Sequence, residues 1–369
     1  MATVRKRKLP SGLIRWQAGY VDGAGERRFK MFDRKADAEA WLVETGYALA
    51  RGLHTPDSVS PTVKAAAELW LRRCHDNGLE QMTQRGYRQH CDLHILPLIG
   101  TKKLSELNIP AVNAFADQLR AKGCSPDMVR RVVKSLGSIF RDAQRRGHSN
   151  ADPTAGLKLD LPERDDPRAV IPSKAELQAL VAGASGRLRP LVLVGTFCGL
   201  RASELRGLRW SDVDFEARVV SINQRADAAH TIGRLKSKSA YRSIPMPPIV
   251  LNALREWKLA CPKGELDLVF PNAIGRVESY ANIVTRDFKP LQKALGVASE
   301  TGEAKFGLHA LRHACASLWI EQGMNPKRIQ KLMGHSSITL TFDRYGHLFS
   351  DAGADQRAAE EIQRQLLGC

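Results

Sequence analysis

Residues 199–214 read Gly-Leu-Arg-Ala-Ser-Glu-Leu-Arg-Gly-Leu-Arg-Trp-Ser-Asp-Val-Asp, and they follow the apolar segment 191–197. The apolar segment predicts a buried helix that ends near Gly199, and a second helix is expected to begin at Arg201. Unpaired backbone N–H groups at the start of that helix form a natural seat for a phosphate, and Arg201 stands beside them. Glu204 lies three residues further on the same helix face, where it can orient Arg201.

Two further motifs carry basic side chains. Residues 235–245 read Leu-Lys-Ser-Lys-Ser-Ala-Tyr-Arg-Ser-Ile-Pro, which predicts a basic turn that leads into a strand. A lysine in such a turn is ordinarily a solubility feature. Residues 309–313 read His-Ala-Leu-Arg-His on a predicted helix, so His309 and Arg312 project together. Taken alone, this pair is more often structural than catalytic.

The last motif, residues 332–347, reads Leu-Met-Gly-His-Ser-Ser-Ile-Thr-Leu-Thr-Phe-Asp-Arg-Tyr-Gly-His. Gly334 is expected to end one helix, and Ser336 or Ser337 to cap the next, which carries Tyr345. A lone tyrosine at a helical position is nearly always a packing residue. This motif alone therefore does not indicate a catalytic role for Tyr345; only the motifs taken together do.

The chain is strongly basic. Its 369 residues contain 56 lysines and arginines against 39 aspartates and glutamates, a formal net charge of +17. An excess of this size is typical of proteins that bind a polyanion, and nucleic acid is the commonest one. A basic protein without such a partner is the alternative.

Targeting and redox features indicate the cytoplasm. The basic N-terminus is followed by Pro10 and Gly12, where a signal peptide needs an apolar stretch. The longest apolar run, 190–200, falls short of the ~20 residues that span a bilayer. The seven cysteines are scattered and never spaced as Cys-x-x-Cys, which argues against a disulfide framework and a zinc site. We expect a cytoplasmic, nucleoid-associated protein without a membrane partner.

Periodicity and linker composition divide the chain into four parts. Residues 1–55 predict a small antiparallel β-sheet with one helix, and residues 60–150 a helical domain. Residues 169–350 predict a mixed α/β domain, mainly helical, and residues 351–369 a tail with a short helix. The helices of the second part are expected at 63–73, 83–96 (stopped by Pro97 and Gly100), 109–122 and 125–146, and the strands of the third part at 218–223, 241–245 and 268–270.

Two basic surfaces suit contacts with DNA. The first is the cationic strand region of the N-terminal sheet, which contains Arg5, Lys6, Arg7 and Lys8. The second is the polar face of helix 125–146, whose charges are nearly all positive and include Arg130, Arg131 and Lys134. A solvated basic surface is the alternative for each.

As a set, the motifs resemble those of the tyrosine recombinase (phage integrase) family. An arginine, a lysine, His-x-x-Arg, Gly-His-Ser-Ser and a tyrosine occur in that family in this order and at these spacings. The resemblance covers residues 60–350, and residues 1–55 look like the arm-site-binding modules of many integrases. It implies a multidomain protein, mainly α with small β-sheets: an N-terminal sheet-plus-helix module, a helical SAM-like core-binding domain and a mixed α/β catalytic domain.

The resemblance also implies roles for the residues of the motifs. Arg201 and Arg312 match the arginines that grip the scissile phosphate and stabilise its growing charge. His309 matches the histidine beside that phosphate, a hydrogen-bond donor and proton acceptor. His335 matches a second histidine that supports the phosphate. Tyr345 matches the nucleophile, whose phenol needs this cationic surrounding to attack.

Which lysine acts as the general acid is the one assignment that stays open. Lys238 aligns best with the general acid for the 5′-oxygen leaving group, and Lys236 is the alternative. Glu204 is expected to orient Arg201. The resemblance implies no metal and no nucleotide cofactor, because fixed cations and a covalent tyrosine carry the chemistry and the phosphotyrosyl bond conserves the energy for resealing.

The implied function is site-specific recombination of DNA through a 3′-phosphotyrosyl intermediate, which integrates and excises a phage or mobile element. The implied partners are double-stranded attachment sites, a homo-tetramer on DNA, and accessory proteins that bend DNA or set directionality. The alternatives are a resolvase of chromosome or plasmid dimers, a topoisomerase of the same chemistry, and an architectural DNA-binding protein without catalysis. The tail helix is expected to dock either on a neighbouring protomer or on its own domain.

Overall fold

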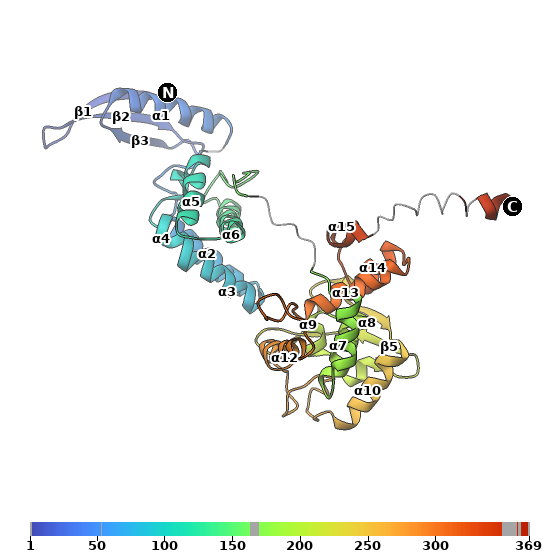
Figure 1. Cartoon of the computed structure of the whole chain (residues 1–369). Coiled ribbons are helices and arrows are strands. Elements are labelled where there is room, and N and C mark those ends of the chain that lie inside the picture. Colours follow the sequence, from blue (N-terminus) through green and yellow to red (C-terminus); the bar gives the residue numbers. More distant parts are fainter. Residues whose placement is uncertain (1, 53, 163–169, 349–359, 361–362, 368–369) are drawn as a thin grey trace. The chain divides into compact units, whose positions relative to one another are not determined.

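The computed structural model describes residues 2–52, 54–162, 170–348, 360 and 363–367. The chain falls into two units, Met1–Asp165 and Asp166–Cys369, and each unit has an apolar core of its own (Figure 1). Helices predominate and the sheets are small, which confirms the predicted fold class. Among the described residues, no helix combines the length and the apolar character that a membrane crossing requires.

The first unit begins with an antiparallel sheet and a helix. The strands are β1 (Thr3–Lys8), β2 (Ile14–Val21) and β3 (Arg27–Phe32), in the order β1-β2-β3, and the helix is α1 (Lys35–Ala50). Side chains alternate between the two faces of a strand, so Ala18 and Tyr20 share a face, and both are buried. Tyr20 packs edge-on against Trp41 of α1, with 5.4 Å between the ring centroids. The helix therefore covers this face of the sheet and leaves the other face open.

A helical bundle completes the first unit. Its elements are α2 (Val63–Asp76), α3 (Gln81–Gln89), a π-helical turn (His90–Ile95), α4 (Leu96–Ile99), a 3₁₀ turn (Leu104–Glu106), α5 (Ile109–Ala121) and α6 (Pro126–Arg145). The side chains of Thr62, Asn108 and Ser125 accept backbone N–H groups at the starts of α2, α5 and α6. Such caps satisfy donors that the helix itself leaves unpaired, and so they fix where each helix begins.

Of the two residues expected to stop the second helix of the bundle, Gly100 does and Pro97 does not. The helical chain continues from α3 through the π-helical turn into α4 and stops at Gly100. Pro97 lies in the first turn of α4, a position where the missing N–H of proline costs little.

The second unit packs helices around two small sheets. Its helices are α7 (Lys174–Gly183), α8 (Leu188–Cys198), α9 (Ala202–Gly207), α10 (Pro248–Ala260), α11 (Tyr280–Asn282), α12 (Lys289–Ala294), α13 (His309–Glu321), α14 (Pro326–Met333) and α15 (Ile338–Tyr345). Its strands are β4 (Val213–Asp214), β5 (Val219–Ile222), β6 (Arg225–Ala226), β7 (Ile232–Gly233) and β8 (Arg242–Pro245). Shorter helical turns are Trp210–Asp212, Lys238–Ala240, Ile283–Phe288 and Gly346–Leu348. The larger sheet has the order β4-β5-β8, and helix α8, almost wholly buried, runs through the core.

Two of the three predicted strands of this unit are present, as β5 and β8. Residues 268–270 form only an isolated bridge, between Leu268 and Arg209. Asp267 just before it has a left-handed φ of 46°, and Pro271 follows, so the extended segment is too short for a ladder.

A separate apolar cluster holds the end of the second unit together. It contains Ala316 and Ile320 of α13, Ile329 and Met333 of α14, and Tyr345. Of the predicted tail helix at 351–369, only residues 360 and 363–367 are described, and they are helical. The rest of that prediction lies outside the described residues.

Candidate active site

Arg201 stands at the junction between α8 and α9. Gly199 ends α8 in the left-handed conformation with φ of 64°, which turns the chain so that Arg201 becomes the N-cap of α9. Its backbone N–H donates to Glu204 Oε2 at 2.8 Å, and its Nη1 donates to Glu204 Oε1 at 2.7 Å. Its Nη2 donates to the carbonyl of Gly334 at 2.9 Å. The guanidinium is thus fixed from two sides, while 33% of the side chain stays exposed.

Glu204 has a second arginine partner, which the sequence reasoning missed. Arg242 of β8 donates to Glu204 through Nη2 at 2.8 Å and Nη1 at 3.1 Å, and both side chains are almost fully buried. Its Nε also donates to the carbonyl of Leu332 at 2.6 Å. A signal was present: Ile244 is apolar and lies two residues later in a strand, so the period of two places Arg242 on the inward face.

Glu204 remains ionised inside this arrangement. Burial by itself would raise the pKa of its carboxyl, but the hydrogen bonds and charge of Arg242, with the charges of Arg201 and Arg312, lower the pKa to about 2. One carboxylate therefore balances cations from α9, β8 and α13.

Arg312 is the most deeply placed cation of the site, with 2% of its surface exposed. Its Nη1 donates to the carbonyl of Gly199 at 2.6 Å, and its Nη2 donates to the carbonyl of Met333. Both acceptors are helix C-terminal carbonyls, which attract a cation. The same residue thus joins the end of α8 to the end of α14.

Tyr345 closes the site from the other side. Its side chain is buried, with 1% exposed, and the ring of His335 stacks against it with 6.5 Å between centroids. Burial raises the pKa of Tyr345 to about 12, although the charges of Arg312 and Arg344 act in the opposite direction. The phenol is therefore protonated at neutral pH.

The histidines of the site are neutral. Burial and the charges of Arg312 and Arg201 lower the pKa of His335 to about 3, and its Nδ1 is 2.9 Å from Thr341 Oγ1. Part of His309 is open to solvent, yet packing around its ring and the charges of Arg312 and Arg344 lower its pKa to about 4. A buried site rich in cations disfavours a further positive charge.

The structure gives the two lysines different surroundings. Lys236 and Lys238 are both exposed in the loop before β8. Lys238 begins the short helical turn 238–240, whose residues Ser239 and Ala240 contact the site: the carbonyl of Ala240 accepts Nη1 of Arg242 at 2.8 Å. A Cβ on Gly334 would lie 3.1 Å from the carbonyl oxygen of Ser239. The chain at Lys238 is therefore tied to Arg242 and Gly334.

The sequence-predicted catalytic residues thus come from five segments of the second unit: Arg201 and Glu204 from α9, Lys238 from the turn before β8, His309 and Arg312 from α13, His335 from the loop after α14, and Tyr345 from α15. Arg344, next to Tyr345, adds a charge that influences both His309 and Tyr345 and was also missed. In the parts of the chain that are described, no group of three or more His, Cys, Asp or Glu side chains is arranged to hold a metal ion.

The four basic residues predicted to contact DNA from β1 lie on two different faces of the sheet. Arg5 pairs with Gln17 and Arg7 with Arg15, on the sheet face away from α1. Lys6 and Lys8 alternate with them and lie on the helix side. The open face also carries Phe29, which is 69% exposed. Arg5, Arg7 and the exposed ring of Phe29 thus share one face of the sheet. Arginines can contact DNA phosphates, and an aromatic ring can contact thymine methyl groups, so this face is suited to DNA.

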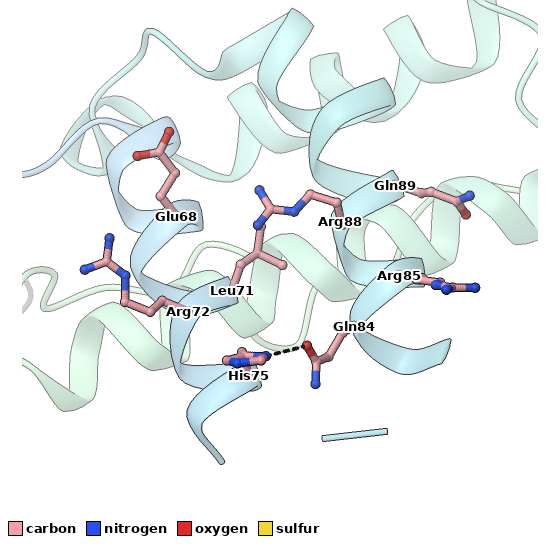
Figure 2. Close-up of a pocket in the computed structure, with 8 residues that line it drawn as sticks. All are labelled: Glu68, Leu71, Arg72, His75, Gln84, Arg85, Arg88 and Gln89. Carbon is pink, nitrogen blue, oxygen red and sulfur yellow. Dashed lines mark hydrogen bonds between the residues drawn. The ribbon is translucent and has the colours of Figure 1, made fainter. Parts of the chain in front are cut away.

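A cationic groove, which no sequence motif indicated, lies between α2 and α3 in the first unit. It has a volume of about 720 Å³ and is lined by Glu68, Leu71, Arg72, His75, Gln84, Arg85, Arg88 and Gln89 (Figure 2). Figure 2 shows Arg72 and His75 on one helix and Arg85 and Arg88 on the other, with His75 Nδ1 3.4 Å from Gln84 Oε1. Three arginines that line one groove offer several positive charges to a nucleic-acid backbone.

On α6, Arg131 and Lys134 are exposed as the sequence suggested. Arg130 is already engaged: its Nη1 is 3.0 Å from Asp127 Oδ1, and its Nη2 donates to the carbonyl of Pro162. The structure therefore leaves Arg131 and Lys134, more than Arg130, available to a partner.

The sequence of the chain is similar to sequences of known proteins. The chain matches the phage integrase family over residues 173–351, the phage integrase central domain over 63–159 and the phage integrase N-terminal domain over 5–51. It is 30% identical over 240 residues to the tyrosine recombinase XerC of Xylella fastidiosa, a match that covers 64% of this chain and 75% of that protein. It is 27% identical over 374 residues to an integrase of prophage phiRv2 from Mycobacterium tuberculosis, covering 98% of this chain and 95% of that protein.

Solved structures show the same fold. The Tn1549 transposon integrase in complex with a circular intermediate DNA matches with a TM-score of 0.66 and 23% identity, over 82% of this chain and 99% of that one. A lambda integrase tetramer bound to a Holliday junction matches with a TM-score of 0.58 and 18% identity, over 90% of this chain and 96% of that one. The chain therefore belongs to the phage integrase family of tyrosine recombinases.

Proposed function

We propose that this tyrosine recombinase integrates, and also excises, a phage or other mobile element by cutting and rejoining DNA at short attachment sites. The observation that carries the proposal is the placement of Tyr345 among Arg201, Arg312, His309 and His335, drawn from distant parts of the sequence. Tyr345 also packs in the apolar cluster of α13 and α14, but packing alone does not require arginines and histidines around its ring. A phenol in this cationic surrounding is suited to attack on a phosphodiester.

The proposed chemistry is a pair of phosphoryl transfers. The hydroxyl oxygen of Tyr345 attacks the scissile phosphorus, the bond from phosphorus to the 5′-oxygen breaks, and a 3′-phosphotyrosyl bond forms. The guanidiniums of Arg201 and Arg312 stabilise the charge that grows on the non-bridging oxygens. Lys238 gives a proton to the departing 5′-oxygen, and His309 receives the proton of the phenol. A 5′-hydroxyl from another strand then reverses these steps.

An incoming phosphate changes the protonation balance of the site. Burial lowers the pKa values of His309 and His335, and the charges of Arg312 and Arg201 lower them further. A negative phosphate among the same cations raises both values, since a nearby opposite charge favours the protonated form. DNA binding thereby prepares His309 to accept a proton, which the DNA-free site disfavours.

DNA recognition is assigned to both units. The open face of the N-terminal sheet, with Arg5 and Arg7, is proposed to bind arm-type sites. The groove between α2 and α3, together with Arg131 and Lys134 of α6, is proposed to contact the backbone of the core site. Four cleavages complete one exchange, and each protomer supplies one tyrosine, which supports a homo-tetramer on DNA at the nucleoid. Proteins that bend the DNA or set the direction of exchange complete the assembly.

The test is covalent capture. A nicked suicide duplex built from the attachment site, which the DNA flanking the reading frame supplies, should yield a protein–DNA adduct with the natural chain and none with Tyr345→Phe. An adduct that persists in the phenylalanine variant overturns the assignment of the nucleophile. Relaxation of plasmids that lack the attachment site would favour the topoisomerase alternative, and salt-sensitive binding without any cleavage would favour an architectural protein.

A further inference from the structure

His313, the second histidine of the His-Ala-Leu-Arg-His motif, has no part in the chemistry proposed above. It follows His309 by four residues on α13, so the two rings project from the same side of the helix and meet edge-on, with 4.6 Å between centroids. His313 Nδ1 lies 2.6 Å from the hydroxyl of Tyr345, and both residues are buried. His313 therefore touches the oxygen that is proposed to attack DNA.

The direction of this hydrogen bond depends on the tautomer of His313. Burial, together with His309, Arg344 and Arg312, lowers the pKa of His313 to about 3, and burial raises that of Tyr345 to about 12, so both groups are neutral at pH 7. A neutral imidazole carries one proton, on Nδ1 or on Nε2. We assign it to Nε2, because the buried phenol then finds an acceptor for its own hydrogen at Nδ1. The lone pairs of the phenol oxygen then remain free.

Other contacts of Tyr345 hold its ring but not its hydroxyl. The ring packs in the apolar cluster with Ala316, Ile329 and Met333 and stacks against His335 at 6.5 Å between centroids. Apolar packing has no directionality, whereas a hydrogen bond fixes the position of a single oxygen atom. Effective attack requires that atom to be placed within a fraction of an ångström.

We propose that His313 is a positioning residue for the nucleophile: by accepting the hydrogen bond of the Tyr345 hydroxyl at Nδ1, it sets where the attacking oxygen lies before cleavage. The proposal rests on the proposed function, because it needs Tyr345 to be the nucleophile. It assigns His313 no proton transfer: the hydrogen bond to Nδ1 breaks as the phenol proton passes to His309 during attack on the phosphate.

The experiment measures single-turnover adduct formation by the full-length chain on the nicked suicide duplex. His313→Ala should lower the rate constant at saturating protein by about 10- to 100-fold, while half-saturation of DNA binding changes less than about two-fold. The matched pair is His313→Asn and His313→Gln. The asparagine carbonyl can occupy the place of Nδ1, whereas the glutamine amide matches Nε2 instead. Asparagine should therefore restore most of the rate and glutamine should not. A purely structural histidine would make the two amides alike.

A second measurement covers the case in which the alanine variant folds poorly. The melting temperatures of the asparagine and glutamine variants are compared with Tyr345 present and in the Tyr345→Phe background. The asparagine variant should melt higher than the glutamine variant only when the hydroxyl is present.

The outcomes separate the two proposals. If the natural chain forms an adduct that Tyr345→Phe abolishes, but all three His313 variants cleave at the natural rate or faster, the positioning role is wrong and the proposed function stands. Equal rates and equal melting behaviour for asparagine and glutamine also overturn the positioning role. If the natural chain forms no adduct, both proposals fail.

Discussion

Replacing Glu204 by glutamine removes one negative charge and almost no volume from the centre of the active site. Glu204 is the shared partner of Arg201 and Arg242, and its carboxylate also lies near Arg312. Arg242 is buried in the same contact, with only 1% of its side chain exposed. The variant therefore leaves buried guanidinium groups without their counter-charge, which is far more costly than losing an exposed ion pair.

The magnitude follows from the pKa of the carboxyl. Folding lowers it from 4.5 to about 2, and each unit corresponds to about 1.4 kcal/mol, so ionised Glu204 stabilises the second unit by about 3 kcal/mol. Removal of one partner from a buried ion pair typically costs about 3–5 kcal/mol, which agrees. Because the folded-state pKa is the lower one, the stabilisation is complete above pH 4.5 and declines as the pH falls toward about 2.

The assay is urea unfolding of the full-length chain. Unfolding is monitored by hydrogen exchange in peptides from α8 and β8, so that the second unit is measured apart from the first. The matched control is Glu303→Gln, the same substitution in the same unit. Glu303 pairs with Lys293 at 3.0 Å, but their side chains are 67% and 47% exposed. The control should lose far less stability, because an exposed ion pair contributes little.

Glu204→Gln should lose about 3 kcal/mol at pH 7, and the deficit should shrink between pH 4.5 and pH 3. A loss no larger than that of Glu303→Gln, or a deficit that is unchanged across this pH range, would refute the view that an ionised carboxylate balances the arginines.

Two further predictions concern the lysine and the groove. Lys238→Met should slow cleavage of the suicide duplex by about 100-fold or more, as expected for loss of a general acid; a 5′-bridging sulfur, which leaves without a proton, should restore the rate, and Lys236→Met is the control. A normal rate in Lys238→Met with a defect in Lys236→Met would transfer the role to Lys236. Arg85→Ala and Arg88→Ala should each reduce the slope of log affinity against log salt by about 0.9, measured by fluorescence anisotropy, whereas Arg120→Ala on α5 should not. Unchanged slopes in both groove variants would mean that the groove between α2 and α3 does not contact the DNA backbone.

Much of the fold was predictable because its signals are local. Thr62, Asn108 and Ser125 mark helix starts through hydrogen bonds within four residues, and glycines at positive φ mark helix ends. The errors came from segments whose conformation is set by the residues that surround them in the fold. Pro97 did not end its helix, and residues 268–270 made a single bridge, because their conformation depends on packing and on the turn at Asp267.

The candidate catalytic set could be predicted because its ordered motifs resemble those of a known family. The choice between Lys236 and Lys238 rests on the alignment of that motif, since two lysines with one residue between them give nearly the same pattern. The assignment of Lys238 stays a prediction; the structure adds that Ala240, two residues later, accepts a hydrogen bond from Arg242.

The sequence by itself identified the residues proposed to do chemistry, because the order and spacing of its motifs resemble those of a known family, and local periodicity placed them on helices. Only the tertiary structure decided how these residues are held. The pairing of Glu204 with Arg242, the contact between His313 and the Tyr345 hydroxyl, and the groove between α2 and α3 each join elements separated in the chain. Such contacts depend on distances across the fold, and local periodicity contains no information about them.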